Sequence, residues 1–180
     1  MQVINKELVQ RILIDRRASK PFLRRFSFAM LHAVGPEFWK NFEIVGMSTK
    51  DGNAGVLLVE LDNTLYATLY EMSSMSRNAS GATKPIICDF CKTWQAGGRA
   101  GSITFRRKSR TLSSITLLCY LDLECSLYVR NMTAAAKTSR SQLREDVTTE
   151  YRIERLRTNL MTLVDRLSIE PMTLCETNVD

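Results

Sequence analysis

The stretch that decides the fold is Cys88-Asp-Phe-Cys91, followed after an intervening segment by Cys119-Tyr-Leu-Asp-Leu-Glu-Cys125. Two close pairs of cysteines are typical of a structural zinc site, because thiolates are good Zn²⁺ ligands and four of them close a tetrahedral shell. The alternatives are buried free thiols and disulfides. We therefore predict one structural Zn²⁺ ion with four ligands: Cys88, Cys91, Cys119 and Cys125. The fifth cysteine, Cys175, is expected to take no part.

The segments around the cysteines predict the order of a treble-clef zinc finger. Residues 102–107 and 114–118 are expected to pair as a β-hairpin, and residues 126–130 to begin a helix. The glycine-rich turn 95–101 is no phosphate-binding loop, because it lacks the Gly-Lys-Ser/Thr ending. A cysteine knuckle, a hairpin and a helix that carries the last ligand make up a treble clef.

The first third of the chain is expected to be mostly helical. Residues 5–15 form a helix with Asn5 as N-cap and one apolar face made of Leu8, Val9, Ile12 and Leu13. Residues 16–25 are basic and interrupted by Pro21, which indicates a solvated loop. Residues 26–34 form a short helix that contains His32, the only histidine and therefore expected in the core.

A small antiparallel sheet is predicted next. Residues 42–47 form a strand, and residues 56–61 and 65–70 form a hairpin around Asp62-Asn63, since Asp and Asn tolerate the positive φ of tight turns. Residues 73–84 are rich in small polar residues and are expected to be a flexible loop.

The clearest helical periodicity begins at Thr148. An apolar stripe is formed by Tyr151, Leu156, Leu160, Leu163, Val164 and Leu167. This stripe predicts a C-terminal helix that packs on the rest of the module. The fold class is therefore α+β, in which a small antiparallel sheet and helices are fused to a treble-clef finger. The expected division is 1–84, 85–170 and a flexible tail, 171–180.

Composition restricts the class of protein. A chain of 180 residues fits one domain, with a net charge of +6 that suits an acidic protein surface or an RNA backbone. The first residues do not resemble a signal peptide, and no segment reaches the roughly 20 apolar residues of a membrane span. We expect a monomeric cytoplasmic protein without membrane contact, where reduced thiols favour metal over disulfide.

The cysteine segments also resemble a known family. Cys88-Asp-Phe-Cys91-Lys-Thr and Cys119-Tyr-Leu-Asp-Leu-Glu-Cys125-Ser-Leu-Tyr-Val-Arg130 resemble the FusB/FusC-type proteins that bind elongation factor G through a C-terminal treble-clef zinc finger. The resemblance extends to the strands before the finger and to the closing helix. It implies a structural zinc ion held by the four cysteines and no catalytic residues.

The resemblance implies a role in translation. Members with an assigned role bind elongation factor G, release it from ribosomes stalled by fusidic acid and so confer resistance. Those proteins carry an N-terminal helical bundle, whereas this chain begins near the module and is similar to shorter members. The expected function is a zinc-stabilised binding protein for elongation factor G. The alternative is a zinc finger that binds RNA or the ribosome, although aromatic residues are not interleaved with the basic ones.

The basic hairpin tip is the expected partner-binding surface. Residues 84–137 carry nine basic and three acidic side chains, and the tip is the densest point. An equal alternative is that the tip is merely solvated. The expected contact residues are Arg106, Arg107, Lys108, Arg110, Tyr128 and Arg130, although Arg130 could instead neutralise the thiolates. A zinc enzyme is disfavoured, because four cysteines leave no open coordination position.

Overall fold

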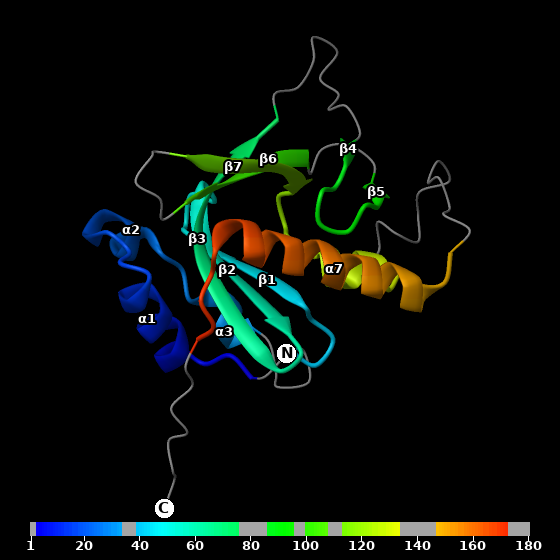
Figure 1. Ribbon diagram of the computed structural model, residues 1–180. Coiled ribbons are helices and arrows are strands. Elements are labelled where there is room, and N and C mark those ends of the chain that lie inside the picture. Colours follow the sequence, from blue (N-terminus) through cyan, green and yellow to red (C-terminus); the bar gives the residue numbers. More distant parts are fainter. Residues whose placement is uncertain are drawn as a thin grey trace, which may run out of the picture.

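The computed structural model describes residues 3–33, 39–75, 86–95, 100–107, 113–133 and 147–172. The helices are α1 (Lys6–Asp15), α2 (Lys20–Arg25), α3 (Ala29–Ala33), α5 (Cys125–Val129) and α7 (Thr149–Leu167). The strands are β1 (Ile44–Ser48), β2 (Ala54–Leu61), β3 (Thr64–Ser74), β4 (Ile86–Ile87), β5 (Trp94–Gln95), β6 (Ala100–Arg106) and β7 (Ser114–Tyr120). The predicted α+β class is confirmed (Figure 1).

One antiparallel sheet, ordered β1-β2-β3-β6-β7, joins the two halves of the chain. The β2–β3 turn falls at the predicted place, with Asp62 and Asn63 at φ of 49° and 61°. Strand β3 pairs with β2 along most of its length, but with β6 only over its last four residues, from Glu71 to Ser74. The short two-stranded sheet β4–β5 lies between β3 and β6 in the sequence and is separate from the main sheet.

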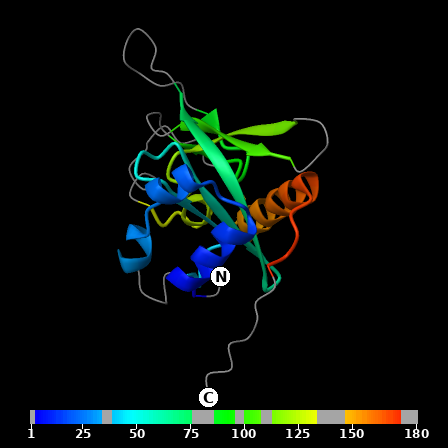
Figure 2. The ribbon, with the colours of Figure 1, turned by 90° about the vertical axis from the view of Figure 1, so that its left-hand side faces the viewer.

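The two faces of the sheet carry different hydrophobic cores. On one face, α1 and α2 pack through Leu8, Val9 and Phe22 onto β1–β3. On the other face, α7 and the cysteine segments enclose a second core, which contains Cys88 and Tyr120. Figures 1 and 2 show the sheet between α7 on one side and the N-terminal helices on the other.

Both long helices begin where the sequence predicts. The Asn5 side chain accepts a hydrogen bond of 2.8 Å from the Leu8 N–H, and Thr148 caps α7 through the Tyr151 N–H. The apolar stripe of α7 is buried from Leu156 to Leu167, as predicted. Tyr151 is the exception, because it lies in the first turn and is 57% exposed.

The predicted loop over residues 16–25 is wrong in its second half. Residues 20–25 form α2, which Ser19 caps through the Phe22 N–H. Pro21 lies in the first turn of this helix, where its missing N–H has no intrahelical partner to lose. Part of 73–84, most of the turn 95–101, the tail after Met172 and the His32 side chain lie outside the described residues. Within the described part, no helix is long and apolar enough to cross a membrane.

Candidate metal centre

The first cysteine pair forms a tight knuckle. Strands β4 and β5 lead into and out of the turn, in which the Lys92 N–H donates to the Cys88 C=O at 2.8 Å and Lys92 adopts a φ of 54°. Asp89 fixes the knuckle to β7, because its N–H donates to the Leu118 C=O and its carboxylate accepts from the Leu118 N–H, both at 2.8 Å. The β-sheet thus positions Cys88 and Cys91.

The third thiol comes from the first turn of α5. The chain turns after β7 at Leu123, which has a φ of 55°, and Cys125 then faces the knuckle. The sulfur atoms of Cys88, Cys91 and Cys125 lie within 4.8 Å of one another and are fully buried. The Cys88–Cys125 sulfur distance is 3.7 Å. Two thiolates bound tetrahedrally to Zn²⁺ lie about 3.8 Å apart, given Zn–S bonds of about 2.3 Å, so this pair fits zinc.

The electrostatics of the three thiols also suit a cation. Burial raises the pKa of Cys88, and in Cys125 the hydrogen bonds to the other two thiols raise the pKa. Burial also acts to raise the pKa of Cys91, but hydrogen bonds from Cys125, Cys88 and Thr93 outweigh it and the pKa lies well below its usual value. Cys91 is therefore the thiol of the three that ionises most easily. A bound Zn²⁺ supplies the positive charge that the other two need to ionise.

Cys119 does not join this group. It lies inside β7 opposite Gly101, and its thiol contacts the Met72 sulfur at 3.8 Å. Tyr120, the next residue of the strand, reaches the knuckle. The Tyr120 hydroxyl donates to the Thr93 C=O at 2.5 Å. Cys119 as the fourth ligand therefore stays a prediction: it is buried in the same core, and the sulfur atoms that lie within 4.8 Å of one another are those of the other three cysteines.

Helix α7 holds the knuckle from outside the thiol group. The Asn159 side chain donates to the Phe90 C=O at 2.7 Å, and the Arg155 guanidinium donates to the Cys91 C=O at 3.1 Å. The two side chains are four residues apart and so lie on one face of the helix. These contacts could not be predicted from the sequence, because both residues are ordinary polar positions beside the apolar stripe.

The expected partner-binding residues fall into three groups. Arg106 and Arg107 are exposed at the end of β6 next to the loop that connects it to β7, and Arg106 pairs with Glu71 at 2.7 Å. Lys108 and Arg110 lie outside the described residues. Tyr128 is 1% exposed and donates its hydroxyl to Asp122 at 2.6 Å, so a direct contact between this side chain and a partner is disfavoured.

Arg130 serves a purpose inside the fold. Its guanidinium forms a two-pronged ion pair with Glu43, and one prong also donates to the Ser126 C=O at 2.9 Å. The Ser126 hydroxyl accepts from the Glu43 N–H at 2.9 Å. Burial acts to raise the pKa of Glu43, but the hydrogen bonds from Arg130 and Ser126 outweigh it, so the pKa is lowered. This cluster joins the start of β1 to the helix that carries Cys125.

Comparison with known proteins agrees with the geometry. The family described as the FBP C-terminal treble-clef zinc-finger matches residues 31–167. This range contains the whole sheet, the thiol group and α7. No curated protein and no solved structure matches the chain. The matched range and the buried thiols assign a structural zinc ion to the chain, which is a zinc-binding protein. The chain belongs to the FBP C-terminal treble-clef zinc-finger family.

Proposed function

We propose that this protein is a zinc-stabilised binding module for elongation factor G. The observation that carries the proposal is the family match over residues 31–167 together with the buried thiol group. The zinc ion fixes the knuckle to α5 and so stabilises the surface around it. The proposed role is binding and not catalysis.

The charge of the module supports an acidic partner surface. Residues 84–137 carry six more basic than acidic side chains. Three zinc-bound thiolates with one Zn²⁺ add about one negative charge, which leaves the finger basic. Arg107 at the end of the β6–β7 hairpin is exposed and is our candidate for this contact. Long-range attraction between a basic finger and an acidic surface speeds association more than it tightens binding.

A pull-down with purified elongation factor G tests the proposal. The zinc-loaded chain is expected to retain the factor, and the chain treated with a chelator to lose it, because metal binding contributes to the folding of small zinc modules. Arg107→Glu is expected to weaken the interaction while zinc stays bound. Failure of the zinc-loaded chain to retain the factor would contradict the proposal.

The same zinc-loaded chain can be used to test the alternative that the protein binds RNA. Binding to ribosomal RNA in place of the factor, with a steep loss of affinity as salt rises, would identify an RNA-binding finger. We further propose that the module releases elongation factor G from ribosomes stalled by fusidic acid. In a reconstituted translation reaction, added protein is then expected to restore synthesis in the presence of the drug.

A further inference from the structure

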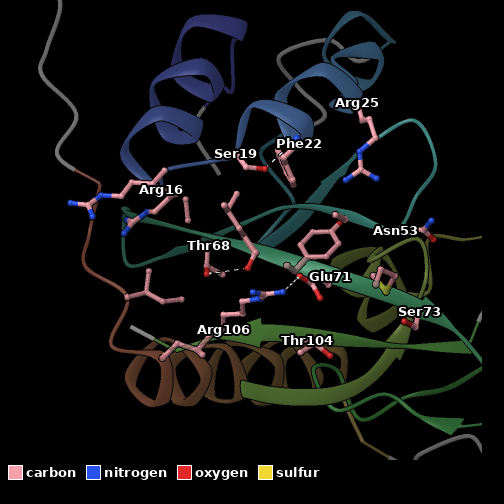
Figure 3. Close-up of a pocket in the computed structure, with 18 of the residues that line it drawn as sticks. Arg16, Ser19, Phe22, Arg25, Asn53, Thr68, Glu71, Ser73, Thr104 and Arg106 are labelled. Atoms are coloured by element: carbon pink, nitrogen blue, oxygen red, sulfur yellow. Dashed lines mark hydrogen bonds and ion pairs between the residues drawn. The ribbon is translucent and has the colours of Figure 1, made fainter. Parts of the chain in front are cut away.

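A large basic hollow lies away from the metal centre. It measures about 910 Å³ and is bounded by the turn after α1, by α2, by strand β3, by β6 and by the end of α7 (Figure 3). No part of its wall comes from the knuckle or α5. The thiol group and the proposed zinc-dependent contact do not account for this hollow.

The floor of the hollow is an open strand edge. On that side of β3, β6 pairs only from Glu71 onward, and the C-terminal segment forms a single bridge from Pro171 to Tyr66. Between these points lie residues 67–70 of β3. Among the described residues, neither β6 nor the C-terminal segment pairs with them on this side. All four line the hollow. The sheet therefore has a gap one short strand long.

The backbone of β3 determines what this gap offers. The Leu65 C=O accepts a hydrogen bond of 2.8 Å from the Met172 N–H, so Leu65 directs its backbone groups to the open side. By the two-residue alternation of a strand, Ala67 and Leu69 direct theirs to the same side. The Thr68 hydroxyl donates to the Leu69 C=O at 3.4 Å. The gap thus presents alternating donors and acceptors.

The charge around the gap is positive. Four arginines line the hollow: Arg16, Arg17, Arg25 and Arg106. Arg106 is paired with Glu71, the one acidic side chain among the described lining residues, and Arg25 is paired with Asp51 outside the lining, each at 2.7 Å. In Figure 3, Arg16 and Arg25 lie toward opposite ends of the helical side, and Arg106 reaches Glu71 across the floor. The Arg106 and Arg25 side chains are 79% and 51% exposed. The lining therefore keeps a net positive charge, and the exposed Arg25 and Arg106 can exchange their surface partners for an anionic occupant.

We propose that the gap binds an extended acidic peptide segment of a partner protein, which adds a short strand to β3 at residues 67–70. Addition of a strand satisfies the edge donors and acceptors together, and four residues span about 13 Å. RNA suits the site less well, since its backbone offers mainly acceptors. The aromatic side chains of Phe22 and Tyr70 are also buried and cannot serve as stacking platforms.

The two sides of the gap predict the pattern of the peptide. Side chains opposite Ala67 and Leu69 face α1 and α2, where the arginines lie, and should be acidic. The intervening side chains face Leu167 and Ile169 at the end of α7 and should be apolar. The expected segment therefore alternates Asp or Glu with Val, Ile or Leu. This inference does not depend on which protein supplies the segment.

Fluorescence anisotropy with the zinc-loaded full chain tests the proposal. The first probes are labelled hexapeptides that alternate acidic and apolar residues. The second probe is the hexapeptide that binds most tightly, synthesised again with every other backbone amide N-methylated. The third is a single-stranded oligouridylate. N-methylation blocks strand pairing and is expected to weaken binding at least about tenfold. Arg25→Glu should also weaken it about tenfold, whereas Arg24→Glu, the exposed neighbour outside the groove, should change it less than about twofold.

Three results would overturn the proposal. The first is that no peptide saturates the protein below about 1 mM. The second is that N-methylation leaves the affinity unchanged, so that strand pairing is not used. The third is that oligouridylate binds in an Arg25-dependent way while the peptides do not. Circular dichroism of both variants checks that they fold. Because zinc stays bound throughout, failure here leaves the pull-down result unaffected.

Discussion

The buried ion pair between Glu43 and Arg130 offers the sharpest test of how the finger is attached to the sheet. The side chains are 8% and 17% exposed, and their sequence positions are 87 residues apart. Arg130→Ala removes the guanidinium but leaves the Glu43 carboxylate buried at the start of β1. A charge stranded in this way destabilises a protein strongly.

The magnitude follows from the burial. Breaking a buried pair by removing one partner costs about 3–5 kcal/mol, and the partial exposure of Arg130 places the expected loss near the lower end, about 3 kcal/mol. Replacing both partners, as Glu43→Gln with Arg130→Met, removes both charges and should cost about 1 kcal/mol or less. The double variant is therefore expected to be more stable than Arg130→Ala alone, although it carries one more substitution.

Urea unfolding at pH 7 with zinc present measures these differences. With a slope of about 2 kcal/mol per molar urea, the midpoint of Arg130→Ala should fall by about 1.5 M. The matched control is Arg157→Ala, whose partner Asp62 is 77% exposed, and it should cost under about 1 kcal/mol. If Arg130→Ala proves as mild as Arg157→Ala, the ion pair does not anchor the finger and the reasoning fails.

Three further predictions concern the metal, the pH and the backbone. Cys125→Ser is expected to abolish zinc binding, measured as metal per chain. Cys119→Ser is expected to retain the zinc ion because its thiol contacts the Met72 sulfur, and loss of zinc in this variant too would identify Cys119 as the predicted fourth ligand. The pKa of Glu43 is lower in the folded chain than its usual value of 4.5, so the ionised carboxylate stabilises the fold. This stabilisation is complete above pH 4.5 and is lost as the pH falls through the folded-state pKa. The free energy of unfolding of the natural chain should therefore approach that of Glu43→Gln as the pH falls into the acid range. Above about pH 5 the difference between the two should stay constant in denaturation experiments. Gly46→Ala would place its Cβ 2.1 Å from a terminal carbon of buried Leu123 and should lower thermal stability by about 1–3 kcal/mol, a loss that Leu123→Ala should partly relieve.

The sequence predicted the elements better than their ends. Periodicity located α1 and α7, and the Asp62-Asn63 turn located the β2–β3 hairpin, because these are local properties. The end of β7 was wrong by two residues, since the strand extends to Tyr120. That difference places Cys119 inside the strand, with its thiol beside the Met72 sulfur. A cysteine count cannot reveal this, because the direction of a side chain depends on the register.

The contacts that join the finger to the sheet could not be predicted from the sequence. Arg130 stood in a plausible surface motif, yet it pairs with Glu43 far away in the chain. The Leu123 side chain fills the space above Gly46 in the same way. Each of these residues is ordinary in its local sequence. Their pairing follows only from the way in which α5 crosses the start of β1, which is a property of the tertiary structure.

The order of the strands has a consequence for how the chain folds. The five strands of the main sheet follow one another in space in the same order as in the sequence. The sheet can therefore grow by one strand at a time. Among the described residues, the core under α1 and α2 contains no cysteine, and all its buried members except Met172 lie before β4. The last cysteine of the thiol group, Cys125, follows the final strand. During synthesis, the N-terminal core can therefore form before the metal site is complete. Zinc then acts at the end of folding, as the step that locks the later core onto an existing sheet.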